Sequence, residues 1–247
     1  TVLDANDLVI LSAGSSAGSR DFSRDVVGAL GEVIFHGIAV RPGKPVLLAS
    51  VGGKPVLGMP GYPVAAQTIL REVAGSLLAW WGLPALPEGE LDVRLSRRLA
   101  SDLGFDEFVP VSVGRVNGTC FATPHPRGGG IQMAVVRANG YIHIPAEREG
   151  FEAGEEVRVR LTVSPAEISR TLICVGVRDP TITELGNCLA DAGYLLHCCK
   201  ASTMGAVLAL RAKTCHAASI SLPETEAAWN DQVLRYLPGV DLLRVQV

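Results

Sequence analysis

The chain has 247 residues, of which 48% are hydrophobic and 19% charged, and its formal net charge is -3 at pH 7. A chain of this size can bury a large core and suits about two or three domains, which argues against disorder. The slightly acidic balance offers no broad basic surface, so we expect no nucleic-acid partner and no membrane partner. An anionic ligand would have to be held locally, in a small-molecule site.

No apolar run reaches the roughly 18 residues that a membrane span needs. The segment Thr1–Asp7 lacks the basic and apolar parts of a secretory signal, and the six cysteines form no CxxC pair. These features predict a cytoplasmic protein with reduced thiols. A zinc site made of Cys198, Cys199, Cys215 and His216 is disfavoured, because adjacent cysteines on a strand point to opposite faces.

The N-terminal region predicts a strand, a helix and a second strand. The continuous apolar run Asp7–Leu11 is typical of a strand buried on both faces of a parallel sheet. Helical spacing of apolar residues follows in Asp21–Leu30, and Val33–Val40 predicts the next strand. We expect these three elements to form a βαβ unit.

A hairpin and a long helix are predicted next. Val46–Ser50 and Pro55–Gly58 flank a glycine pair, Gly52 and Gly53, which favours a tight turn. The helix should run from about Tyr62 to Trp81, with Trp80 and Trp81 packed in the core.

Short alternating runs over Leu91–Val163 predict a small barrel or sandwich of mostly antiparallel strands. Alternation of strands and helices then returns after Ser164, with further strands at Leu172–Val177, Tyr194–Cys199, Ala217–Ser221 and Val240–Val247 and helices from Thr181, Ser202 and Glu224. We therefore expect an α/β chain with domains at 1–85, 86–163 and 164–247. The first domain is expected to be incomplete at its start and the last at its end.

The loop Ser12–Asp21 joins a strand to a helix, as phosphate-binding loops do. Its glycines would let backbone amides approach an anion, and its serines would donate hydrogen bonds. The candidate binding residues are Ser12, Gly14, Ser15, Ser16 and Gly18. Loops of small residues are common after strands, so an ordinary connection remains the alternative.

Two proline-rich turns carry the other candidate residues. The first consists of Arg41, Pro42, Gly43, Lys44 and Pro45, and it fixes two cations at the end of a strand, where an oxyanion could bind. The second contains Pro60, Gly61 and Pro63 and precedes the long helix, whose N-terminus favours an anion. Asp21 is the one carboxylate beside these positive loops, so it could bind a divalent cation or cap the helix. The alternatives for the two turns are a solvated surface turn and a simple helix start.

These motifs, in this order and spacing, resemble the molybdopterin-binding domain of MoeA-type proteins. The matching segments are LSAGSSAGSRDF, HGIAVRPGKPV and VLGMPGYP. Leu91–Val163 is similar to the C-terminal β-domain of that family, including RGGGIQMAVVRANGYIHIP. The remainder resembles the periplasmic-binding-protein-like domain, similar to LysR substrate-binding domains, that is fused to some members.

The resemblance implies a molybdopterin molybdenumtransferase, with a MogA-like three-layer domain and a homodimeric assembly. Such an enzyme inserts molybdate into adenylylated molybdopterin and releases AMP, assisted by Mg2+. Carried over by position, Asp21 would be linked to the metal, Arg41 and Lys44 would lie near molybdate, and Ser12–Gly18 would bind the pterin phosphate. The family's upstream acidic residues lie before Thr1, so we expect this piece alone to be inactive.

The sequence departs from the family pattern at several positions. Ala13 replaces the first glycine of the serine-glycine loop, Tyr62 replaces an asparagine, Met133-Ala134 replaces a serine-bearing segment, and Gly37 replaces a lysine found in some members. Two other functions therefore stay open. One is a non-catalytic scaffold or oxyanion sensor on the same fold. The other is a molybdopterin adenylyltransferase, against which the β-domain counts.

Overall fold

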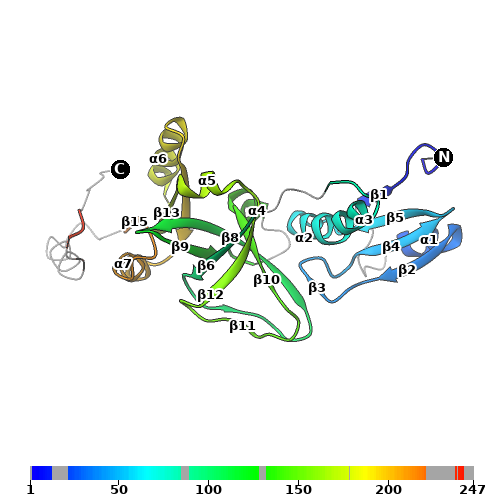
Figure 1. Ribbon diagram of the computed structural model, residues 1–247, viewed down its shortest axis with the longest axis horizontal. Helices are drawn as coiled ribbons and strands as arrows, with labels where there is room; N and C mark the ends of the chain where they lie inside the picture. The colour runs from blue at the N-terminus through cyan, green and yellow to red at the C-terminus, as the bar shows by residue number, and fades with distance from the viewer. Residues whose placement is uncertain are drawn as a thin grey trace.

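The computed structural model describes residues 2–12, 22–84, 89–127, 132–177, 179–220, 237 and 239–241. Three main sheets lie in a row along an elongated molecule: an N-terminal sheet, a central barrel and a small parallel sheet (Figure 1). The chain is thus a mixed α/β protein with a barrel at its centre. In these ranges no helix is long and apolar enough to cross a membrane.

The N-terminal sheet has the strand order β1-β5-β4-β2. β1 and β2 lie at its two edges and run in the same direction, because β1 is parallel to β5 and the next two pairings are antiparallel. The predicted strand–helix–strand crossover is therefore present, with the hairpin β4–β5 inserted between its strands. The elements are β1 (Val9–Ser12), α1 (Ser23–Leu30), β2 (Glu32–His36), β4 (Leu47–Val51) and β5 (Lys54–Met59).

The prediction that the first strand is buried on both faces was wrong. β1 is an edge strand, and Ile10 keeps 44% of its surface exposed. The physical reason is that α1 and the long helix pack mainly on the central strands, one on each face. Val27 of α1 packs against Leu47 and Val56, whereas Ile69 of the long helix packs against Leu57.

The hairpin forms as predicted, with Gly52 and Gly53 at positive φ angles of 60° and 79°. The long helix also forms, but one widened turn interrupts it. It consists of α2 (Pro63–Ile69), the π-helical turn η1 (Leu70–Ala74) and α3 (Gly75–Trp80). The prediction that the tryptophans are core residues was wrong: Trp80 is 79% exposed, and α3 has no buried residue because it extends beyond its contacts with the sheet.

The central sheet closes into the small barrel that was predicted. Its order is β10-β12-β6-β9-β8-β3, and β10 also pairs with β8, which joins the ends of the ring. Val111, Val113, Ile142 and Val159 are fully buried in its core. The elements are β6 (Gly89–Leu95), β7 (Leu99–Ala100), β8 (Asp106–Val116), β9 (Thr119–Pro124), α4 (Gln132–Arg137), β10 (Gly140–Ile144), β11 (Gly150–Phe151) and β12 (Glu156–Leu161).

The strand β3 (Val40–Arg41) belongs to the barrel although its sequence lies within the N-terminal region. It pairs in parallel with β8, matching Val40 with Asp106 and Arg41 with Glu107. The predicted strand Val33–Val40 is therefore broken between β2 and β3. At this break the chain leaves the N-terminal sheet and joins the barrel at β3, where the first proline-rich turn begins.

The third sheet has the all-parallel order β14-β13-β15, as the alternation of strands and helices predicted. Its elements are α5 (Pro165–Ser169), β13 (Thr171–Gly176), α6 (Pro180–Asp191), β14 (Leu195–Lys200), α7 (Thr203–Arg211) and β15 (Ala217–Ser219). Ser202 caps α7 by accepting the Gly205 N–H at 3.1 Å. The predicted helix from Glu224 and most of the strand Val240–Val247 lie outside the described residues.

The third sheet packs directly on the barrel through a histidine seam, which we define as Ser112, His125, His197 and His216. Ser112 is fully buried on β8, and its Oγ lies 2.7 Å from both His125 Nε2 and His197 Nδ1. His216 accepts the Ile173 N–H at 2.9 Å, and its Nε2 lies 3.0 Å from the Arg115 carbonyl oxygen. Hydrogen bonds therefore tie the third sheet to the barrel.

Candidate active site

The described parts of the three predicted motifs gather around the start of α2. Ser12, the last residue of β1, is in register with Met59, the last residue of β5. The first residue of the serine-glycine loop and the last residue before Pro60 therefore lie side by side at one end of the sheet. This arrangement fits the expectation that the carboxyl ends of parallel strands present ligand-binding loops together.

The first proline-rich turn packs against the same helix. Gly43 is buried with a φ of 134°, and a Cβ at this position would lie 2.7 Å from Ile69 Cδ1. A side chain at residue 43 would thus clash with α2 in a backbone conformation that L residues rarely adopt. Glycine here lets the turn approach the helix closely, with the Arg41-Pro42 peptide bond in the cis form.

Arg41 is held in place by the barrel. Its guanidinium lies 3.8 Å from the centroid of the Phe105 ring, and Nη1 lies 2.5 Å from Asp102 Oδ2. Lys44 Nζ is 5.8 Å from the same ring. Cations over one aromatic face form a positive group of defined position, which suits recognition of an oxyanion.

Arg41 and Pro42 line a cavity of about 260 Å3, here called the Arg41 cavity, between α2 and the barrel. Glu107 on its wall is a buried carboxylate that accepts hydrogen bonds from Ser101 at 2.6 Å and from Arg127 at 3.3 Å. Both Arg41 and Arg127 therefore bring positive charge to the cavity, and each has a carboxylate partner.

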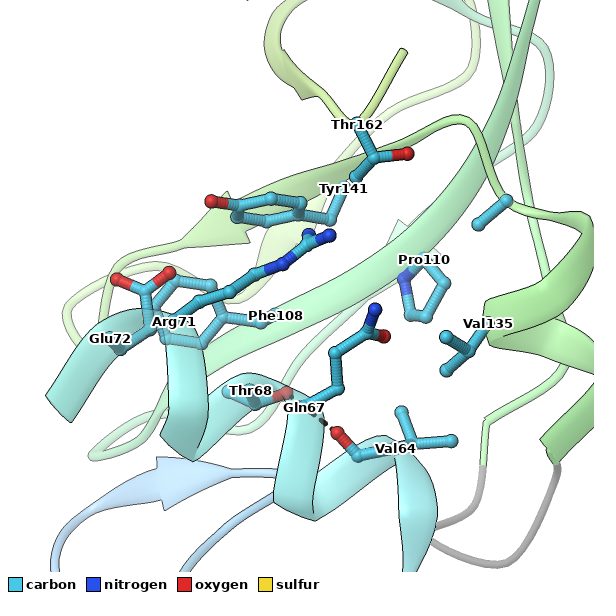
Figure 2. Close-up of a pocket in the computed structure, with 11 residues that line it drawn as sticks. Val64, Gln67, Thr68, Arg71, Glu72, Phe108, Pro110, Val135, Tyr141 and Thr162 are labelled. Atoms are coloured by element: carbon cyan, nitrogen blue, oxygen red, sulfur yellow. Dashed lines mark hydrogen bonds between the residues drawn. The ribbon is translucent and has the colours of Figure 1, made fainter. Parts of the chain in front are cut away.

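A second cavity of about 280 Å3, here called the Tyr141 cavity, continues along the same helix. Val64, Phe108 and Pro110 line both cavities, so the two are adjacent, and together they are here called the cleft between α2 and the barrel. Figure 2 shows Gln67 and Arg71 pointing from the helix toward the strands that carry Tyr141 and Pro110. The Arg71 guanidinium lies 4.9 Å from the Tyr141 ring centroid.

An ion pair closes one end of the Tyr141 cavity. Arg160 Nη1 lies 3.4 Å from Glu72 Oε2, and its guanidinium is 5.9 Å from the Tyr141 ring. The cleft thus combines aromatic rings, an amide and several cations. A ligand with a flat ring system and a phosphate would find complementary groups there.

The predicted site residues other than Ser12 divide into four groups. Arg41 and Pro42 line the cleft, whereas Gly43 and Lys44 support the turn. Pro60 is buried and Gly61 and Pro63 are exposed at the start of α2, but none of these three lines either cavity. Gly14, Ser15, Ser16, Gly18 and Asp21 lie outside the described residues.

The departures from the family pattern have defined positions. Tyr62 is the N-cap residue of α2 and is 64% exposed, with no side-chain cap hydrogen bond. Ala134 lies on α4 and lines the Arg41 cavity, so the replaced serine-bearing segment borders the cleft. Gly37 has a φ of 90°, a conformation that a lysine would adopt only with strain.

Sequence reasoning missed the wall that the barrel contributes. Glu107, Phe108, Arg127 and Tyr141 come from segments that were treated only as alternating strands or loops. One sign was available for the helix side: Arg71 and Glu72 are charges in an otherwise apolar helix, and both line the cleft.

The described residues do not supply a magnesium site. Among them, no group of three or more histidine, cysteine, aspartate or glutamate residues is placed to hold a metal ion. The carboxylates that line the cleft, Glu72 and Glu107, are paired with arginines. Asp21 lies outside the described residues, so its metal role stays a prediction.

The histidine seam resembles a nucleophilic serine site in composition but not in geometry. Ser112 is fully buried, and both imidazoles face the same oxygen instead of forming a chain that ends on a carboxylate. Burial and, to a lesser extent, the nearby Arg137 charge together lower the pKa of His125 to about 4 and that of His197 to about 4. Both rings are neutral at pH 7, so the seam is structural.

The cysteines also behave as packing residues. Burial raises the pKa of the Cys199 thiol to about 11 and that of Cys215 to about 11. A hydrogen bond with Cys198, together with burial, raises the pKa of Cys174. These thiols are protonated at pH 7 and poor nucleophiles.

Two family models match the chain. Residues 1–80 match the family described as "Probable molybdopterin binding domain", and residues 92–162 match "MoeA C-terminal region (domain IV)". The sheet beside the cleft and the barrel are thus the two parts of a molybdopterin-related architecture. Together the matches show that the chain contains, within residues 1–162, two domains similar to those of MoeA-type molybdopterin biosynthesis proteins.

Known proteins resemble the same region. A Methanocaldococcus jannaschii protein named for molybdopterin biosynthesis is 34% identical over 161 residues, covering 65% of this chain and 38% of that protein. A molybdopterin molybdenumtransferase of Haemophilus influenzae is 30% identical over 162 residues, covering 62% and 39%. The crystal structure of a molybdopterin biosynthesis MoeA protein from Pyrococcus horikosii has a TM-score of 0.53 at 34% identity, covering 66% and 39%. The chain therefore spans about two-fifths of the length of these relatives.

Proposed function

We propose that the protein acts in molybdenum cofactor biosynthesis as a molybdopterin molybdenumtransferase. The substrates would be adenylylated molybdopterin and molybdate, and AMP would be released. The observation that carries this proposal is the cleft between α2 and the barrel, where Arg41 is fixed between Phe105 and Asp102 at the mouth of an aromatic-lined cavity.

The geometry supports the binding of different parts of the substrates at the two ends of the cleft. Arg41, Lys44 and Arg127 form the cationic end, which suits the molybdate oxyanion and the phosphate of the pterin. Phe108 and Tyr141 offer rings beside the Tyr141 cavity, which suits the flat pterin. Positioned cations stabilise negative charge that develops during displacement of AMP, so the protein need transfer few protons.

Asp21 is proposed as the acidic residue linked to Mg2+. Full-length protein carrying Asp21→Asn should lose molybdenum insertion, measured as cofactor that restores activity to a cofactor-free molybdoenzyme. Asp25→Asn, at an acidic residue in the first turn of α1, is the matched control and should retain activity. Normal turnover by Asp21→Asn would remove the catalytic assignment.

The sensor alternative makes a different prediction. The third sheet is proposed to belong to a periplasmic-binding-protein-like domain of LysR type, on the basis of the sequence resemblance. If the protein were a sensor, calorimetry of the full-length protein would detect molybdate binding while insertion activity was absent. Asp179 and Ser202 already cap α6 and α7 with their own oxygens, which disfavours an oxyanion at those helix starts.

The adenylyltransferase alternative is disfavoured by the barrel, whose side chains make one wall of the cleft.

A homodimer and a cytoplasmic location are expected from the family resemblance. Sedimentation equilibrium of the full-length protein tests the first, and fractionation of cells that express it tests the second.

A further inference from the structure

A third cavity, separate from the cleft, lies where the barrel meets α6 and β14. Its volume is about 250 Å3, and it is here called the Arg137 cavity. Arg137, the last residue of α4, forms its barrel side, and the third sheet and α6 form the rest. Among the described residues, none lines both this cavity and the Arg41 or Tyr141 cavity.

The lining combines polar and apolar side chains, which lie side by side along α6. Arg137, Thr183, Asn187 and Tyr194 bring a guanidinium, hydroxyls and an amide. The apolar part includes Ile182, Gly186, Ala190 and Leu196. A few converging polar groups in an otherwise apolar hollow are typical of small-molecule sites.

We propose that this cavity binds a small organic carboxylate with an apolar body about the size of one aromatic ring. The carboxylate would pair with Arg137, and its body would lie against Ala190 and Leu196. The family matches do not reach the helix and strand that form most of this cavity, since they end at residue 162.

The lining favours a single negative charge over a tetraoxoanion such as molybdate. Arg137 is the one cation among the described residues of the lining, and Asn187 Nδ2 donates to the Glu184 carboxylate at 3.0 Å, which places negative charge next to the cavity. A dianion would meet this carboxylate and would have no apolar surface to place against Ile182 or Leu196. A monoanion with an apolar body can pair with Arg137 and contact the apolar residues of the lining.

The lowered pKa values of His125 and His197 support a positive charge beside the Arg137 cavity. The Arg137 charge lowers the pKa of both imidazoles, so its guanidinium lies within electrostatic reach of the histidine seam. Both rings stay neutral and do not compete for an anion. The Arg137 carbonyl oxygen accepts a hydrogen bond from Ser112 at 3.3 Å, which anchors the end of α4 beside the cavity.

Isothermal titration calorimetry of the whole chain with benzoate tests the proposal, with benzamide as the neutral analogue of the same shape. Benzoate should bind about tenfold or more tightly than benzamide, because a hydrogen bond to a charged group is worth more than a neutral one. Arg137→Gln should remove this preference. Arg211→Gln, an exposed arginine in the last turn of α7 and not on the lining, should leave it unchanged.

A second pair of variants keeps the test decisive if Arg137→Gln disturbs the fold. Ala190→Leu adds bulk to the lining and should weaken the binding of both probes about tenfold or more. Cys188→Leu adds bulk to an exposed position of the same helix outside the lining. Cys188→Leu should bind like the parent chain. Absence of saturable benzoate binding, equal binding of benzamide, unchanged binding by Ala190→Leu, or molybdate binding in place of benzoate would each overturn the proposal.

Discussion

The two faces of the barrel differ in charge: the face toward α2 carries charged side chains, and the face toward the third sheet carries neutral ones. Toward α2, the barrel meets the helix across a cleft lined by three arginines, each beside an aromatic ring or a carboxylate: Arg41, Arg71 and Arg127. Toward the third sheet, it meets β14 through neutral histidines on a fully buried serine. Fixed charge with access to solvent can recognise an anion, whereas neutral hydrogen bonds can be buried at little cost. The comparison predicts that changes in the cleft alter activity and changes in the seam alter stability.

The largest effect is expected from Arg41→Ala in the full-length protein. Loss of a positioned charge that stabilises a reacting oxyanion lowers kcat by about 10²-fold or more. Insertion of molybdenum into adenylylated molybdopterin measures it, with urea unfolding to confirm an intact fold. Arg158→Ala is the control, because Arg158 pairs with Asp92 on the barrel outside the cleft lining. Equal losses in both variants would contradict a specific role for Arg41.

A stability effect at the cleft is expected from Gly43→Ala. The added Cβ would lie 2.7 Å from Ile69 Cδ1 at a φ of 134°, so strain and a clash act together. The free energy of unfolding should fall by about 2–3 kcal/mol. Gly52→Ala measures the cost of backbone strain alone, since Gly52 has a φ of 60° and a Cβ added there would meet nothing within 4 Å. This substitution should lower the free energy of unfolding by only about 1 kcal/mol. Urea unfolding compares the two, and similar losses would show that α2 yields to the methyl group.

The seam should make stability fall as the pH is lowered. His125 and His197 have folded-state pKa values of about 4, below their ordinary 6.5, so between these values the unfolded chain binds more protons. The free energy of unfolding therefore rises with pH from about 4 to 6.5 and is constant above. The loss at pH 4 is on the order of 3 kcal/mol for each ring as an upper bound.

Urea unfolding at several pH values in this window measures the slope. The double variant His125→Gln with His197→Gln should flatten it, and His36→Gln, on an exposed position of β2, should not. A slope that survives the double variant would assign the acid sensitivity to carboxylates instead.

Local patterns in the sequence predicted most elements, but not the surfaces between them. Gly52-Gly53 specified the hairpin turn, and the alternating runs after Leu91 specified barrel strands, because turn chemistry and side-chain period are local properties. The break of Val33–Val40 into β2 and β3 was not predictable, since β3 forms by pairing with β8 in a distant part of the chain. Tertiary pairing there overrides a continuous β pattern.

The same distinction applies to the site. Arg41 and Pro42 could be chosen from the sequence because they stand in a recognisable turn. Phe108 and Tyr141 could not, since a strand residue becomes a cavity wall only through the partner that the barrel meets. Trp80 shows the converse: hydrophobicity predicts burial only where another element is present to cover the residue.

The smallest effect is expected from Arg71→Gln. Its contact with the Tyr141 ring at 4.9 Å is a partly exposed cation–π pair, worth about 0.5–1 kcal/mol, so folding should change little. If the Tyr141 cavity binds the pterin, loss of this cation should raise KM severalfold while kcat stays nearly constant, because the contact would be equal in the ground and transition states. Arg24→Gln, on α1 at the opposite face of the N-terminal sheet, should change neither constant. A fall in kcat without a change in KM would place Arg71 with Arg41 among the groups that act on the reacting oxyanion, and the division of the cleft into a cationic end and a pterin end would then be wrong.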